Sequence, residues 1–141
     1  MRFTHDQILA AGCRFSERGF QRLGPEEHRV INLANMSDVA LPELANLLRD
    51  SIREAAPDDS LYKSTAYWAL ARKHDPRFRD FFLEMLPLEL DSSLPCAWQI
   101  VIALECIGED VLTPATKMVN DDRLMAADAR RYLNRLAPLP A

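Results

Sequence analysis

Apolar residues recur at helical spacing through most of the chain. The pattern i, i+3, i+4, i+7 predicts a series of amphipathic helices. No segment alternates apolar and polar residues with β-branched enrichment, so strands are not expected. Glycines and prolines mark most of the boundaries. The eight predicted helices span Thr4–Arg18, Pro25–Met36, Pro42–Ala55, Ser60–His74, a segment that begins at Pro76, Leu94–Ile107, Asp110–Asn120 and Asp122–Leu136.

Three of these segments carry the clearest apolar faces. The helix from Leu94 to Ile107 is apolar on nearly all sides, which predicts a covered helix. The two amphipathic stripes consist of Leu41, Leu44, Ala45, Leu48, Ile52 and Ala55, and of Phe78, Phe81, Phe82, Met85 and Leu86.

Thr4 and Gln7 fit a capping box at the start of the first helix.

A unit of helix, turn and helix recurs along the chain. Positions Leu33 to Leu48 match Leu70 to Met85 at an offset of 37, and Leu104 matches Leu70 at an offset of 34. Such units stack and share one core, because neither helix can bury its stripe alone. The spacing predicts one domain of three helix pairs at 25–58, 59–91 and 92–121. Residues 1–24 would cap one end and 122–141, a half repeat, the other; a generic helical bundle is the alternative.

The spacing of helix, turn and helix, together with the packing pattern of Ala66-Tyr67-Trp68-Ala69-Leu70-Ala71, resembles HEAT-like repeats. The resemblance covers about Val30 to Leu136. It implies an all-α fold, a HEAT-like α-solenoid of about eight antiparallel helices.

Net charge, hydropathy and cysteine usage indicate the cellular compartment of the protein and the partners it is not expected to bind. A formal net charge of −4 argues against unspecific nucleic-acid binding. No apolar run approaches the roughly 20 residues that span a bilayer. Cys13, Cys96 and Cys106 form no C-x-x-C pair, which is typical of reduced thiols, and Cys96 and Cys106 are predicted to be buried. We therefore expect a cytoplasmic protein that binds no membrane.

No motif predicts catalysis, a cofactor or a metal site. His5, His28 and His74 lack metal-ligand spacing. Ser60-Leu61-Tyr62-Lys63 matches S-x-x-K, but no K-T-G or S-D-N follows, and Ser60 is better explained as a helix cap. The four scattered glycines form no phosphate-binding loop. We expect that the chain is not an enzyme.

The aromatic residues of two helices are predicted to be core for the most part. Tyr62, Tyr67, Trp68 and Trp98 lie at helical spacing, where core packing is the default. Tyr62 and Tyr67 are the better candidates for interface anchors, because Ala66, Ala69 and Leu70 define a different face.

Acidic residues concentrate in the second half of the chain. Residues 84–122 contain eight acidic residues against one basic residue, Lys117. Asp58-Asp59, Glu89 with Asp91, and Asp121-Asp122 are predicted to lie in loops between repeats. They would form an acidic ridge, although helix capping is the main explanation for each pair. The predicted partner-binding residues are Glu43, Asp50, Asp80, Glu84, Glu89, Asp91, Lys117, Asp121 and Asp122.

Size, acidity and repeat architecture are similar to those of bacterial immunity proteins of contact-dependent inhibition and polymorphic toxin systems. The resemblance implies an antitoxin that neutralises a cognate toxin domain, such as a basic nuclease, as a monomer in a one-to-one complex. A HEAT-like scaffold or adaptor is the alternative. A HEAT-like DNA-repair glycosylase or lyase is a third hypothesis, with Arg72–Arg79 and Trp68 as its only candidate DNA surface.

Overall fold

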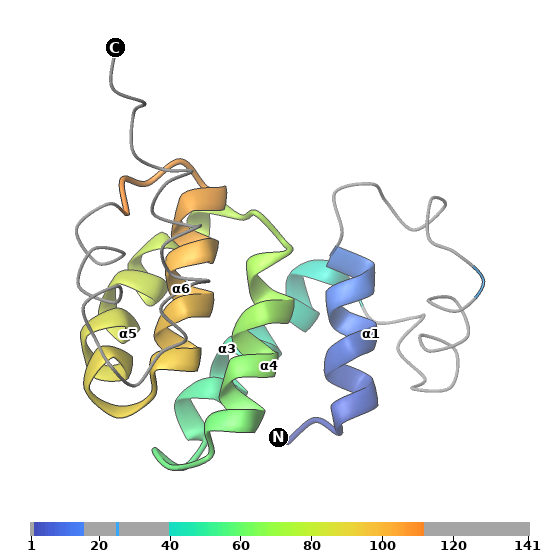
Figure 1. Ribbon diagram of the computed structural model, residues 1–141. Coiled ribbons are helices and arrows are strands. Elements are labelled where there is room, and N and C mark those ends of the chain that lie inside the picture. Colours follow the sequence, from blue (N-terminus) through green and yellow to red (C-terminus); the bar gives the residue numbers. More distant parts are fainter. Residues whose placement is uncertain (1, 16–24, 26–39, 112–141) are drawn as a thin grey trace.

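The computed structural model describes residues 2–15, 25 and 40–111. Within these ranges the chain forms only helices and turns, as the sequence predicts (Figure 1). The elements are α1 (His5–Phe15), α3 (Leu41–Glu54), α4 (Ser60–Ala71), the 3-10 turn η2 (Pro76–Phe78), α5 (Arg79–Ser92) and α6 (Leu94–Cys106). The helices predicted over 26–36, 112–120 and 122–136 lie outside the described residues.

Side chains cap the first turns of α1 and η2. At the start of α1 the Thr4 hydroxyl accepts from Gln7 N (3.2 Å), and Thr4 N donates to the Gln7 amide oxygen (3.0 Å), so the capping box is confirmed. Asp75 accepts from Arg77 N at 3.0 Å and caps η2. The predicted cap at Ser60 is wrong, because Asp59 occupies the cap position of α4 and makes no capping hydrogen bond.

The two amphipathic stripes form the core as predicted. Leu44, Leu48 and Ile52 are buried on α3. Phe81 and Phe82 are buried on α5, with their ring centroids 5.6 Å apart. Burial of such side chains stabilises a fold by about 1.5–3 kcal/mol each.

The described helices form two layers. In Figure 1, α1, α4 and α6 lie side by side in one layer, with α4 in the middle. Behind them α3 packs on α4, and α5 packs on α6. The chain runs up through α4, down through α5 and up again through α6. Leu70 and Leu104, which the repeat analysis matched, occupy equally buried places on α4 and α6.

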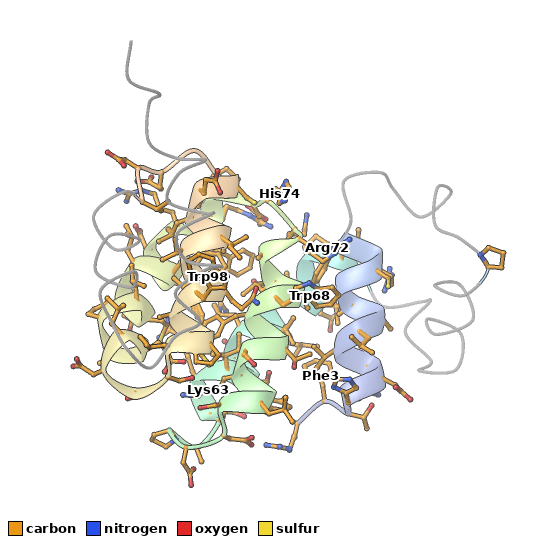
Figure 2. All side chains as sticks on the ribbon, viewed as in Figure 1. Phe3, Lys63, Trp68, Arg72, His74 and Trp98 are labelled. Carbon is orange, nitrogen blue, oxygen red and sulfur yellow. The ribbon has the colours of Figure 1, made fainter. Side chains whose placement is uncertain are left out.

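Close approach between α1 and α4 depends on a glycine. A β-carbon at Gly12 would overlap the indole ring of Trp68, so only glycine lets the two helices meet at this distance. Arg72 extends from the end of α4, donates from Nε to the Gly12 carbonyl oxygen (3.1 Å) and lies over the Trp68 ring (Figure 2). This contact joins the N-terminal helix α1 to α4.

The sequence analysis expected the tyrosines to be more exposed than the tryptophans, and the structure shows the opposite. Tyr62 and Tyr67 are buried, whereas Trp68 and Trp98 are only partly buried. Tyr67 faces α5 and stacks with Phe81 at 6.2 Å. The Tyr62 hydroxyl oxygen accepts from Phe3 N at 3.1 Å. Both tyrosines therefore join elements of the core.

Cys106 is exposed, so its predicted burial is wrong, whereas Cys96 is buried as predicted. Cys106 lies in the last turn of α6 and two residues after the inward-facing Leu104. Two residues in a helix correspond to about 200°, which turns Cys106 toward solvent.

Candidate functional site

The predicted partner-binding residues that the structure describes lie on α3 and α5. Glu43, Asp50, Asp80, Glu84 and Asp91 are exposed. Lys117, Asp121 and Asp122 lie outside the described residues.

Glu89 is the exception, and its predicted place on an exposed loop is wrong. It lies inside α5 on the same face as Phe82 and Leu86, because its spacing from them is helical. Its carboxylate pairs with Lys63 of α4 at 2.9 Å, and the two side chains are only 3% and 5% exposed. Lys63 also donates to the Pro57 carbonyl oxygen at 3.1 Å. Glu89 thus joins α5 to α4 and cannot touch a partner.

The exposed carboxylates are interleaved with arginines. Asp50 pairs with Arg49 (3.1 Å), Asp80 with Arg79 (3.2 Å) and Glu84 with Arg53 (3.0 Å). The loop acid Asp59 pairs with Arg2 at 2.9 Å. Because Glu89 is buried, it cannot belong to the predicted acidic ridge, and Asp121 and Asp122 of that ridge lie outside the described residues. These surfaces carry both signs of charge.

An apolar stripe that the sequence analysis missed runs along the outer face of α5. Leu83 is 38% exposed and Leu88 is 56% exposed, and Pro87 between them is exposed as well. Asp80, Glu84 and Asp91 continue the same face at helical spacing. We call these six residues the α5 stripe. The signal was present in the sequence, since Leu83 and Leu88 fall outside the buried Phe81, Phe82 and Leu86 pattern.

Pro87 deprives one backbone carbonyl of the α5 stripe of its usual hydrogen-bond donor. It stands inside α5, and proline has no N–H to donate to the carbonyl four residues earlier. The Leu83 carbonyl oxygen therefore lacks its intrahelical donor. It can accept a hydrogen bond from a bound molecule or from water.

The arginines of the hypothetical DNA surface are used within the chain. Arg72 binds the Gly12 carbonyl and covers Trp68. Arg77 binds Asp75, with an N–O distance of 2.6 Å. Arg79 binds Glu109 and Asp80. Arg77 and Arg79 are 65% and 49% exposed, but each pairs with carboxylates that offset its charge, so these two arginines offer little uncompensated positive charge for phosphate binding and do not favour a DNA-repair function.

The S-x-x-K sequence forms no catalytic arrangement. The Lys63 ammonium is buried and held by Glu89 and Pro57, so it is not available as a base. The Ser60 carbonyl oxygen accepts from Cys96 Sγ at 3.6 Å. The Lys63 side chain and the Ser60 backbone carbonyl therefore join α4 to α5 and α6, respectively.

Two buried polar atoms near Lys63 have no hydrogen-bond partner among the described residues. They are Tyr67 Oη and Glu89 Oε2. Burial raises the pKa of Tyr67, and the Glu89 carboxylate raises it further. Burial also raises the pKa of the Cys96 thiol to about 12, partly offset by a hydrogen bond with Ser93. Tyr67 and Cys96 therefore stay protonated at neutral pH.

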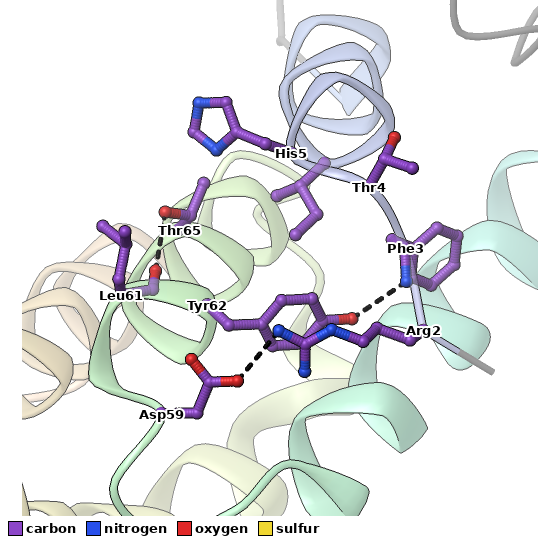
Figure 3. A pocket seen from close by; sticks show the side chains of 9 residues that line it. Arg2, Phe3, Thr4, His5, Asp59, Leu61, Tyr62 and Thr65 are labelled. Atoms are coloured by element: carbon purple, nitrogen blue, oxygen red, sulfur yellow. Dashed lines mark hydrogen bonds and ion pairs between the residues drawn. The ribbon is translucent and has the colours of Figure 1, made fainter.

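A pocket lies between the N-terminal segment and the start of α4 (Figure 3). Its volume is about 290 Å³. Ile8, Leu61 and the Tyr62 ring supply apolar walls. Arg2 and Asp59 form an ion pair at its edge, and the Arg2 guanidinium lies 4.1 Å from the centre of the Tyr62 ring. The sequence analysis missed this pocket, because its walls come from segments far apart in the chain.

The described residues contain neither a membrane-spanning helix nor a cluster of metal ligands. None of the helices over 2–15 and 40–111 combines the length and apolar character needed to cross a bilayer. Among the described side chains, no group of three or more His, Cys, Asp or Glu could hold a metal ion.

Comparisons with protein-family models, with curated proteins and with solved structures find no match to this chain.

Proposed function

We propose that this chain is a protein-binding module that acts as an antitoxin, and that it binds its toxin domain through the α5 stripe. The observation that supports binding is the exposure of Leu83 and Leu88 next to Pro87 on one helix face. Protein interfaces combine an apolar centre with a polar rim, and Asp80, Glu84 and Asp91 supply such a rim. Leu83, Pro87 and Leu88 adjoin at helical spacing on one face of α5, and a contiguous exposed apolar group with a polar rim is suited to contact with a partner.

The choice of a toxin as partner rests on the resemblance to immunity proteins in size, acidity and helical repeats. A net charge of −4 is suited to a basic partner such as a nuclease. Because Asp80 and Glu84 are paired with arginines, we assign most of the affinity to the leucines. The carboxylates would mainly speed association.

The test uses the whole chain as bait for the protein encoded next to its own gene. We expect a one-to-one complex and loss of the partner's toxicity when the chain is co-expressed. The double variant Leu83→Lys with Leu88→Lys should weaken binding about 100-fold, since two interface leucines contribute roughly 1.4 kcal/mol each. Both positions are exposed, so the variant should keep the helical circular-dichroism spectrum of the unmodified chain.

A matched control introduces the same charge elsewhere. Asn46→Lys with Ala56→Lys adds two lysines at exposed positions outside α5 and should leave the affinity unchanged. Equal losses in both variants would argue against the α5 stripe as the interface. A neighbouring protein that binds but is not toxic would replace the antitoxin hypothesis with the adaptor hypothesis.

A further inference from the structure

We propose that the pocket between the N-terminal segment and α4 is a subsite for an arginine side chain of a bound peptide, and that Arg2 of the chain itself fills its charged end in the free protein. The inference does not depend on the α5 stripe. It rests on the contacts of Arg2, Asp59 and Tyr62.

The first step concerns Asp59. An aspartate at a helix cap position ordinarily accepts from the backbone of the first turn, but Asp59 makes no such bond. Its carboxylate instead points to the Arg2 guanidinium, at 2.9 Å. One side of the pocket therefore carries a carboxylate that binds a cation.

The second step concerns Tyr62. Its hydroxyl is held by Phe3 N, which fixes the ring at the edge of the pocket (Figure 3). The ring presents a π face to the guanidinium, with 4.1 Å between the Arg2 carbon Cζ and the ring centre. A carboxylate and an aromatic face at one place form a site that prefers the planar, delocalised arginine cation.

The third step concerns the remaining space. The pocket holds about 290 Å³ beyond the Arg2 side chain, at the lower end of ligand-site volumes and suited to a single amino-acid side chain. Ile8 and the largely exposed Leu61 offer apolar contacts to the methylene stem of an incoming arginine. The head of that arginine would take the place of Arg2.

Arg2 is suited to exchange because it is weakly held. Its side chain is 63% exposed, and exposed ion pairs contribute only about 0–1 kcal/mol. An arginine of a peptide that also contacts the apolar walls can therefore compete with it.

The test is an NMR titration of the full chain with N-acetyl-arginine amide, which follows the Leu61 methyl and Tyr62 ring signals. We expect saturable shifts that become at least threefold tighter in Arg2→Ala, because the internal competitor is removed. Asp59→Asn should weaken binding about tenfold. Asp58→Asn, an exposed acid one residue earlier, is the matched control and should change nothing.

Three results would overturn the proposal. One is an absence of saturable shifts in Arg2→Ala, which has a vacant charged end. Another is equal binding of N-acetyl-leucine amide, which would define the pocket as simply apolar. The last is unchanged arginine binding in Asp59→Asn. Since the titration uses no protein partner, its failure is separate from any failure of the antitoxin proposal.

Discussion

At the scale of single residues, the buried Lys63–Glu89 pair is the most sensitive point of the described core. Removing one partner leaves the other charge buried and unpaired, so Lys63→Met should lower the free energy of unfolding by about 3–5 kcal/mol. The double variant Lys63→Met with Glu89→Leu should recover most of that loss, because apolar side chains of similar size can replace a buried pair. Urea unfolding curves of the three proteins measure both effects.

A surface ion pair provides the control for this prediction. Arg53→Met breaks the exposed pair with Glu84 and should cost no more than about 1 kcal/mol. A Lys63→Met variant that loses as little as Arg53→Met would mean that water reaches Glu89.

The buried Cys96 thiol predicts that stability falls at alkaline pH. Its folded pKa is raised to about 12, above the ordinary value near 9. Between these values the unfolded chain loses a proton that the folded chain keeps, so rising pH favours unfolding. The loss approaches about 1.4 kcal/mol per pH unit for this one group. Urea midpoints at pH 8, 9.5 and 10.5 should decline, and Cys96→Ala should make the decline less steep.

The raised pKa of Tyr67 acts in the same direction. Its proton is also kept in the folded chain and lost from the unfolded chain above about pH 10. A comparison of slopes below pH 10 therefore separates the thiol from the phenol. Identical slopes for Cys96→Ala and the unmodified chain in that range would contradict the prediction.

At the scale of elements, the contact between α1 and α4 depends on Gly12. Gly12→Ala places a methyl group where the Trp68 ring lies, so α1 must move outward. We expect a loss of about 1–3 kcal/mol and a shift of the Trp68 fluorescence toward longer wavelength. Trp68→Leu in the Gly12→Ala background should restore part of the stability. The loss of unfolding free energy caused by Gly12→Ala should be smaller in a Trp68→Leu chain than in the unmodified chain. Equal losses in the two chains would mean that the loss does not come from contact with Trp68.

The elements also show what the sequence could and could not predict. The apolar stripes of α3 and α5 repeat at helical spacing, so their burial followed from the sequence alone. In α4 apolar residues occur on several sides, and the sequence does not tell which side meets α1 and which meets α6. Tyr67 and Trp68 are neighbours in the chain and were assigned the wrong relative exposure for that reason.

Charged residues were predicted less well, for a different physical reason. The burial of Glu89 depends on Lys63, which is 26 residues earlier in the chain. The Asp59 carboxylate binds Arg2, although its position at the start of α4 suggested a helix cap. Such pairs depend on how helices are placed in three dimensions, and helical periodicity contains no information about them. The leucines of the α5 stripe were recoverable, because they fall outside the buried pattern of their own helix.

At the scale of the whole described structure, α4 is the central element, and this predicts an order of local stability. It packs against α1, α3 and α6, whereas α1 packs mainly against α4 and less extensively against α3. Segments with fewer buried contacts open more easily. Amide hydrogen exchange should therefore be slowest in α4 and α6 and faster in α1.

The Gly12→Ala variant makes this order testable in one experiment. If α1 opens separately, the variant should speed exchange in α1 while α4 and α6 keep most of their protection. If all three helices lose protection together, α1 belongs to one cooperative unit with α4 and α6. In that case the pocket beside Tyr62 would lose its Ile8 wall only on global unfolding, because Ile8 belongs to α1.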